Sequence, residues 1–246
     1  MAATDTSEFM HNRLLAALPA AARERLFPHM SKVDFPLGKV LYESGDKLTN
    51  VYFPKDSIVS LLYVMESGAS AEISVVGNEG MIGIAVFMGG ESTPSRAIVQ
   101  SAGSAFSLAS SRLSAEFNNY PEMRMLMLRY TQSLLTQMAQ TAVCNRHHSI
   151  DQQLCRWLLL SLDRLSSNNL VMTQELIANM LGVRREGVTE AAGKLQKHGV
   201  IKYQRGHIKV LDRAGLEKLC CECYAVVRAE TDRLQAYGPL FNPPVP

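Results

Sequence analysis

The stretch that decides the fold is TQELIANMLGVRREGVTEAAGKLQKHGVI, residues 173–201. Thr173 is a favourable N-cap for a first helix, and Gly182 is suited to end that helix. A second helix is predicted over residues 185–198. The following VIKYQRGHIKVL predicts a two-stranded hairpin that turns at residues 205–207. The order of helix, glycine turn, helix and hairpin is typical of a winged helix-turn-helix, a DNA-binding motif.

The second of these helices has the apolar back and polar front that a helix in the major groove needs. At 100° per residue, Val188, Ala192 and Leu195 share the apolar side. Arg185 is predicted to donate two hydrogen bonds to a guanine, and Glu186 to accept one from a cytosine. Phosphate contacts, which position a protein without reading sequence, are expected from Thr173, Gln174, Lys194, Arg205, His207 and Lys209. The complete predicted DNA interface adds Arg184, Arg185, Glu186, Thr189 and Glu190.

Positive charge is concentrated in the same region. The 246-residue chain has a formal net charge of +2, whereas residues 172–213 hold 8 basic and 4 acidic side chains. An anionic partner should therefore meet this block. A helical hairpin with a solvated charged face is the alternative, and the complete order of elements favours DNA binding over it.

The preceding residues predict two further units. Residues 33–113 form short β-rich runs that Gly, Asp and Pro interrupt, which is typical of a small antiparallel sandwich or barrel. Residues 121–147 predict one long helix with two apolar seams. Met123, Met127, Tyr130 and Leu134 form the first seam, and Leu128, Leu135, Met138 and Ala142 form the second. One seam could face the β domain and the other a partner helix, or both could form one wide core-facing stripe.

Several of these segments resemble one family. Residues 173–201 are similar to the helix-turn-helix of the Crp/Fnr transcription regulators, and VLYESGD, VYFPKDSIVSLL and the stretch up to PSRA resemble their β-roll. The resemblance covers about residues 20–215. It matches Arg185 and Glu186 to the base-reading pair of the family. Arg184 stands where the family usually has a Ser N-cap, Gly187 where it has Thr, and Glu190 where an Arg often reads a base.

The resemblance implies an α+β fold with an N-terminal antiparallel, jelly-roll-like β-roll, a long dimerisation helix and a C-terminal winged helix-turn-helix. The expected units are a sensor domain with N-terminal helices at 1–120, a dimerisation helix at 121–148, a DNA-binding domain at 149–225 and an extension at 226–246. The last residues of that extension, GPLFNPPVP, are expected to lack regular structure.

The expected function is that of a homodimeric transcription regulator that binds an inverted repeat in double-stranded DNA. An effector at the β-roll is expected to modulate DNA affinity, and RNA polymerase is the expected protein partner. No catalytic motif such as a Walker loop, GxSxG or HExxH is present, so an enzyme is not expected. No apolar run is long enough to span a membrane.

The expected ligand segment, IGIAVFMGGESTPSRA, departs from the cyclic-nucleotide pattern of the family. Ile84 replaces the Glu that accepts from the ribose, and Ser95 replaces the Arg that binds phosphate. Arg96 comes one residue late, and a strand there would turn it to the other face. Cyclic AMP of the usual kind is therefore not expected; a dinucleotide, an apolar effector or no ligand remain open. The candidate ligand-binding residues are Gly83, Gly89, Gly90, Glu91, Thr93, Ser95 and Arg96.

All five cysteines follow residue 143, which favours a reducing cytoplasm over a disulfide framework. The absence of an earlier cysteine excludes the N-terminal iron–sulfur site of some relatives. Cys220, Cys221 and Cys223 form CCEC but lack the second pair typical of zinc sites, so no metal ligand is predicted. No cofactor is identified. Two alternatives stay open: a regulatory module that does not bind DNA, and a thiol or metal redox sensor that acts through CCEC.

Overall fold

Two antiparallel sheets form the core of the N-terminal half of the chain. The computed structural model describes residues 6–236 of the protein. The strand orders are β1-β7-β3 and β2-β6-β4-β5. Phe35 and Ala105 of the first sheet and Val59 and Val99 of the second pack in one core, so the sheets enclose it together. The strands are β1 (Ser31–Phe35), β2 (Val40–Tyr42), β3 (Asn50–Pro54), β4 (Ile58–Val64), β5 (Ser70–Val76), β6 (Arg96–Ser101) and β7 (Gly103–Ala109). The predicted antiparallel β domain is confirmed.

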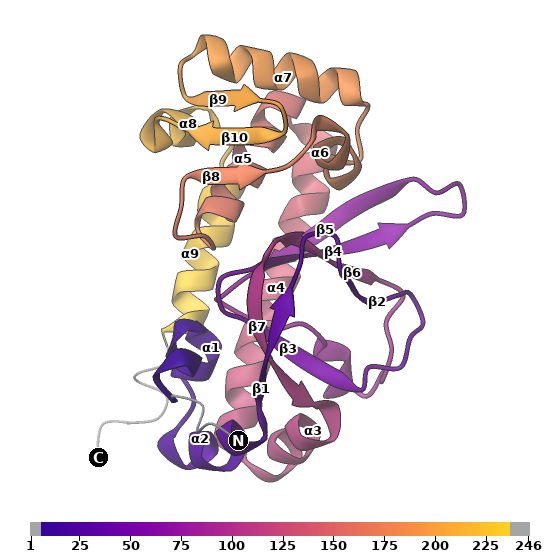
Figure 1. The fold of residues 1–246 in the computed structure, drawn as a ribbon, viewed down its shortest axis with the longest axis vertical. Helices are drawn as coiled ribbons and strands as arrows, with labels where there is room; N and C mark the ends of the chain where they lie inside the picture. Colours follow the sequence, from indigo (N-terminus) through magenta and orange to yellow (C-terminus); the bar gives the residue numbers. More distant parts are fainter. Residues whose placement is uncertain (1–5, 237–246) are drawn as a thin grey trace.

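Short helices close the lower end of this domain (Figure 1). Phe9, Leu14 and Leu26 from these helices pack with Phe106 of β7 in a second core. Arg25 makes a bidentate ion pair with Glu116, which ties the first helices to the last one before the long helix. The helices are η1 (Thr6–His11), α1 (Arg13–Ala16), α2 (Ala20–Leu26), η2 (Phe27–His29), η3 (Ile84–Val86) and α3 (Ser110–Asn119).

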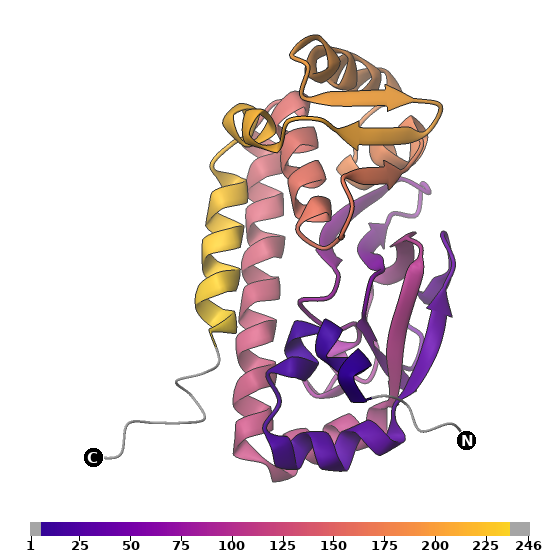
Figure 2. The ribbon, with the colours of Figure 1, turned by 60° about the vertical axis from the view of Figure 1, so that its left-hand side comes forward.

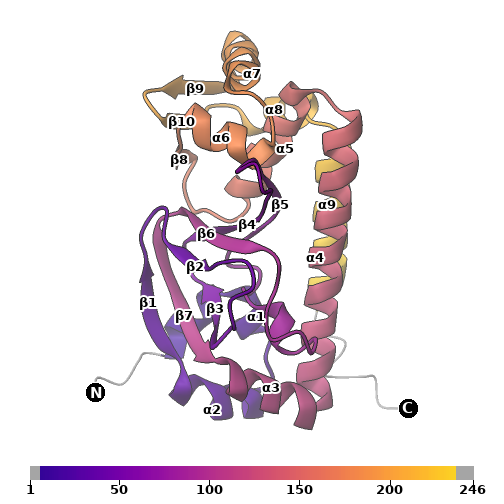
Figure 3. The same cartoon turned by 90° about the vertical axis from the view of Figure 1, so that its right-hand side faces the viewer.

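The long helix α4 (Pro121–His147) begins with a proline at its first helical position, where no backbone donor is lost. Its first predicted seam is buried against the β domain, and the Tyr130 hydroxyl donates to the Met81 carbonyl at 2.8 Å. Met138, expected in the second seam, packs on the β-domain core instead. Figure 3 places α4 along the outer edge of the molecule. Within residues 6–236, no helix has the length and apolarity needed to cross a bilayer.

The C-terminal domain stands on the β domain (Figure 1) and begins with α5 (Ile150–Leu162). Ser149 and Gln152 cap this helix reciprocally in a capping box. Helices α6 (Gln174–Leu181) and α7 (Arg185–Lys197) follow, separated by Gly182 in a left-handed conformation. The predicted hairpin, β9 (Ile201–Gln204) and β10 (His207–Val210), gains a third strand, β8 (Asn169–Val171), which pairs with β10.

The chain ends its described part with α8 (Arg213–Leu219) and α9 (Cys223–Gln235), and α9 lies beside α4 (Figure 2). Arg129 near the start of α4 donates to the carbonyls of Arg233 and Leu234 at the end of α9, so the two helices are antiparallel. The expected boundary between residues 225 and 226 thus falls inside α9, because Tyr224, Val227 and Leu234 recur at helical spacing and are buried. The stretch GPLFNPPVP lies outside the described residues.

Buried polar groups join the two domains. Arg164, after α5, donates from Nε to Glu79 Oε1 of the β domain at 2.7 Å, and both side chains are at most 10% exposed. Gln100 of β6 donates to the Ser161 hydroxyl of α5 at 3.2 Å. Glu72 of β5 is also buried, with Arg156 among the charged groups near it. The domains therefore share a polar contact whose groups depend on one another for hydrogen bonds and charge balance.

Candidate functional site

The predicted DNA-contacting residues lie on the exposed surface of α6, α7 and the hairpin. Val188, Ala192 and Leu195 are buried on the inner side of α7, as the 100° periodicity predicts. Gln174 is half-buried, and the other ten candidates are exposed: Thr173, Arg184, Arg185, Glu186, Thr189, Glu190, Lys194, Arg205, His207 and Lys209. Ten of the eleven side chains are thus accessible to a partner, and their contacts with DNA remain a prediction.

Local capping fixes the two helices of this surface. The Thr173 side chain accepts from the Leu176 amide as the N-cap of α6. The Thr189 hydroxyl of α7 lies 2.8 Å from Gln174 Oε1, which joins the two helices on their exposed side. Arg184 occupies the N-cap position of α7 without a side-chain cap. The first amides of α7 are therefore available to an anion such as a phosphate.

The arginines of this surface differ from Lys194 in their pairing. Lys194 lies 3.0 Å from Glu190 and 3.1 Å from Asp151, and its hydrogen bonds to these carboxylates raise its pKa. Within the described residues, no ion pair holds Arg184, Arg185 or Arg205. The charge of these arginines is therefore available to DNA, and Lys194 is partly neutralised by its own chain.

An open hollow joins the start of α6, the start of α7 and the hairpin turn. Its lining includes four predicted residues, Thr173, Gln174, Arg185 and Arg205, together with Tyr203. Arg205 and Gly206 both have positive φ, as a two-residue hairpin turn of this kind requires. Sequence reasoning missed Tyr203, whose hydroxyl donates to the Met172 carbonyl at 2.8 Å and so fixes the hairpin to the segment between β8 and α6.

The β domain holds a small cavity of about 90 Å³ between the β2-β6-β4-β5 sheet, the segment around η3 and α4. Three of the predicted ligand-binding residues, Gly83, Thr93 and Ser95, line it. Burial raises the pKa of Tyr42, whose hydroxyl shares a hydrogen bond with Ser95. Most of the remaining lining is apolar: Leu48, Leu61, Ile73, Met81, Ile84, Ala85, Leu134 and Met138. Alternation along β5, SAEISVV, was an available sequence signal for Ile73, whereas β4, IVSLLYV, does not alternate and gave none for Leu61.

The other ligand candidates lie outside this lining. Arg96, at the start of β6, pairs with Glu43 at 3.2 Å. Glu91 pairs with Lys47, and both side chains are at least 70% exposed. Gly89 and Gly90 are exposed near it. The structure thus separates the seven candidates into three that line the cavity and four that do not.

The cavity does not fit a cyclic nucleotide. Among residues 6–236, no Lys or Arg lines it, so a phosphate would be buried there without a cation from the described part of the chain. Its volume of about 90 Å³ is well below the roughly 300–1,000 Å³ of ordinary ligand sites. Ile84 and Ser95, at the positions that the family uses for the ribose and the phosphate, both line it.

Comparison with known families finds two matches. The Crp-like helix-turn-helix domain matches residues 152–219, and the cyclic nucleotide-binding domain matches residues 32–120. The second match covers the domain as a whole, but the residues that line its cavity differ from those with which the family binds a cyclic nucleotide. A comparison with curated protein sequences finds no match.

Comparison with solved structures finds the same architecture. A protein from Eubacterium rectale classed with the Crp/Fnr regulators has a TM-score of 0.67 at 17% identity, over 85% of this chain and 98% of that one. FixK2 from Bradyrhizobium japonicum has a TM-score of 0.65 at 16% identity, over 78% and 98%. The c-di-GMP-responsive global regulator CLP of Xanthomonas campestris has a TM-score of 0.60 at 15% identity, over 78% and 99%.

Together the two family matches cover more than half of the chain. The cyclic nucleotide-binding match comes first, and α4 connects it to the helix-turn-helix match. The helix-turn-helix match is to the Crp-like class, and the structures from Eubacterium rectale and Xanthomonas campestris are described as regulators. The chain is a member of the Crp/Fnr family of transcription regulators, with a helix-turn-helix DNA-binding domain.

Proposed function

We propose that the chain acts as a homodimer, in the cytoplasm, and binds an inverted repeat in DNA through α7 of each protomer. The observation that carries this proposal is that Arg184, Arg185 and Arg205 are exposed around the start of α7 and the hairpin turn and have no ion-pair partner among residues 6–236. Two copies related by a two-fold axis would read half-sites about one helical turn apart, or 34–36 Å. RNA polymerase is the proposed protein partner at the promoter.

Replacing Arg185 with alanine should weaken specific DNA binding by roughly 1–3 kcal/mol and relax specificity at one base pair of each half-site. The physical reason is the loss of a two-pronged donor to guanine from the exposed start of α7. The measurement is selection of DNA from a random pool, followed by binding titrations of the selected site and its single-base variants.

Lys209→Ala on β10 is the matched control for the Arg185 variant. Its side chain is exposed, and a phosphate contact would make the loss uniform across sequences and lower the salt dependence by about one ion. A uniform loss for Arg185→Ala as well would mean that Arg185 contacts phosphate. No enriched sequence for the unmodified chain at low salt would contradict DNA reading altogether.

Dimerisation is proposed through the outer side of α4. Met125, Leu128 and Leu135 are each about half exposed there and follow one another at spacings of three and seven, as in a coiled coil. Val143 is also about half exposed and lies one position beyond the next place in this repeat. Gln132 and Ala139 fill the intervening exposed positions of the same stripe. Four large apolar side chains along one helix are more than a monomer needs to leave in water, which supports a helix of a second copy as their partner.

Leu135→Glu should convert the dimer to a monomer at micromolar concentration, because two carboxylates would face each other across the helix pair. The residue is 52% exposed in one chain, so the substitution should leave the folded protomer intact. Sedimentation equilibrium of the variant and of the unmodified chain measures the change. Glu122→Gln, at an exposed position in the first turn of α4, is the control. A dimer that survives Leu135→Glu would place the interface elsewhere.

The proposed effector site is the β-domain cavity, and its lining favours a small, mainly apolar molecule over a nucleotide. Leu134 and Met138 of α4 line it together with the strands. An occupant would therefore contact the same helix that is proposed to pair the protomers, and could shift the distance between the two copies of α7. The relative CLP is described as responsive to c-di-GMP; the present lining supports a different class of effector.

A further inference from the structure

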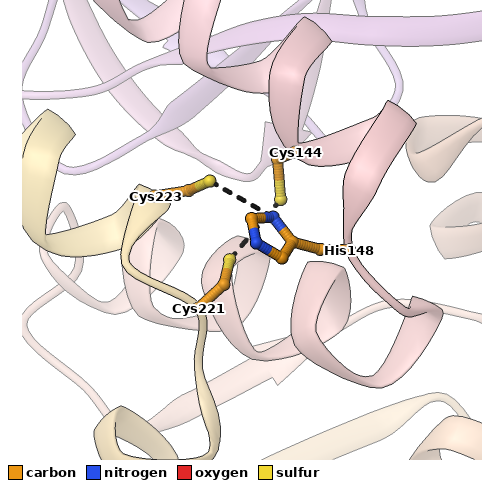
Figure 4. A group of neighbouring side chains, drawn as sticks. All are labelled: Cys144, His148, Cys221 and Cys223. Carbon is orange, nitrogen blue, oxygen red and sulfur yellow. Dashed lines mark hydrogen bonds between the residues drawn. The ribbon is translucent and has the colours of Figure 1, made fainter.

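Two pairs of side chains from distant parts of the sequence meet where α4 ends and α9 begins (Figure 4). Cys144 lies in the last turn of α4, and His148 is its C-cap residue. Cys221 and Cys223 come from the turn between α8 and α9 and from the first residue of α9. Two of the three cysteines of CCEC belong to this group, and Cys144 and His148 at the end of α4 complete the four ligands that zinc takes.

The distances among these groups are those of a tetrahedral site. The sulfur atoms of Cys144 and Cys221 are 3.6 Å apart, and Cys223 Sγ is 3.4 Å from His148 Nδ1. All four possible ligand atoms lie within 4.8 Å of one another. Zinc bonds of about 2.3 Å to sulfur and 2.0–2.1 Å to nitrogen give tetrahedral edges of roughly 3.8 Å between sulfurs and 3.5 Å between sulfur and nitrogen. Movements within about 1 Å would therefore complete the coordination.

The surroundings of the four groups are those of a metal site. His148 presents Nδ1 to the sulfurs, and its Nε2 lies 3.4 Å from the Glu222 carboxylate. A histidine that binds a metal usually donates its other ring N–H to such a carboxylate, which fixes the ring. Gln140 of α4 also donates to Cys223 Sγ at 3.0 Å, a bond that suits a thiolate. The three cysteines are at most 6% exposed, so the group is shielded from water.

We propose that Cys144, His148, Cys221 and Cys223 bind one Zn²⁺ ion, which fastens the start of α9 to the end of α4. The ion would sit directly before α5, because the Gln153 side chain of α5 donates to the His148 carbonyl at 2.9 Å. It would thereby fix the junction between the long helix and the DNA-binding domain. This assignment does not depend on the proposed function in DNA binding or on an effector.

The test uses the full chain, purified in reductant, stripped with a chelator and then titrated with Zn²⁺ alone. Native mass spectrometry should find one zinc ion per chain. Substituted Co²⁺ should give the thiolate charge-transfer absorption and intense d–d bands of tetrahedral sulfur coordination. Cys223→Ser should abolish stoichiometric binding, whereas Cys220→Ser should retain it, because Cys220 is outside the four-residue group. Chelation should lower the Tm of the unmodified chain and leave that of Cys223→Ser unchanged.

Glu222→Gln keeps the test valid if a cysteine variant does not fold. Glu222 is exposed, so this variant should fold normally and bind zinc about 10–100-fold more weakly, since it loses the carboxylate that orients His148. Three results would overturn the proposal: no zinc bound under reducing conditions, equal zinc binding by Cys223→Ser and the unmodified chain, or a mass two hydrogens lower that reveals a Cys144–Cys221 disulfide in reductant.

Discussion

Arg164→Ala is expected to lower the free energy of unfolding by about 3–5 kcal/mol, the usual result of removing one partner of a buried ion pair. Arg164 and Glu79 have side chains that are 6% and 10% exposed, and their shortest contact is 2.7 Å. Without the guanidinium, the Glu79 carboxylate would keep only the Gly77 amide as a donor on its other oxygen. The remaining negative charge would be buried at the domain contact, which is the source of the loss.

Urea unfolding followed by circular dichroism measures this loss. Arg233→Ala is the control, because Arg233 is 59% exposed in its pair with Glu230 and such surface pairs contribute little to stability. The double variant Glu79→Gln/Arg164→Ala should recover part of the stability, since no carboxylate is then left without a cation. If the double variant instead loses the sum of the two single losses, the two residues are not coupled.

The second large effect is expected at Glu72, whose pKa burial raises from 4.5 to about 7. Ser60, Arg156 and Arg164 favour its charged form, but burial outweighs them. Because the folded-state pKa lies above the unfolded one, the stabilisation is complete below about pH 4.5 and is lost as pH rises through 7. The shift corresponds to about 3 kcal/mol of stability lost at alkaline pH.

Glu72→Gln should flatten that fall, because an amide does not ionise. The measurement is the free energy of unfolding of both proteins at intervals between about pH 5 and pH 8. This range covers most of the interval between the unfolded-state and the folded-state pKa of Glu72. Glu66→Gln, at an exposed position between β4 and β5, should leave the slope unchanged. Parallel curves for the unmodified chain and Glu72→Gln would show that Glu72 does not set the pH dependence.

Local signals predicted the DNA-binding surface well. Thr173 and Gly182 mark the ends of α6 because a side-chain oxygen can cap a helix start and glycine tolerates positive φ at its end. The periodicity of Val188, Ala192 and Leu195 orients α7 without knowledge of any other part of the chain. In α4, the seam through Met127 and Leu134 was predictable for the same reason.

Features that depend on distant partners were not predictable from one sequence. The strand β8 is three residues long and exists through its pairing with β10. Cys144 and Cys221 are 77 positions apart, so nothing in the spacing of CCEC pointed to α4. The sequence pattern assigns Met138 and Leu135 to the same seam of the long helix, but in the structure Met138 packs against the core of the β domain. Pairings over such separations are set by the packed domain rather than by local preference.

The antiparallel contact of α9 with α4 has a consequence during synthesis. The last residue of α9, Gln235, is made 88 residues after His147 at the end of α4, which at ribosomal speed is a delay of roughly 5–20 s. Until then, the side of α4 that carries Arg129 and Gln140 has no cover, and it is exposed together with the apolar stripe. A nascent chain therefore exposes two surfaces of α4 to a neighbouring chain. Once α9 has packed against one of them, the apolar stripe is the surface left for pairing.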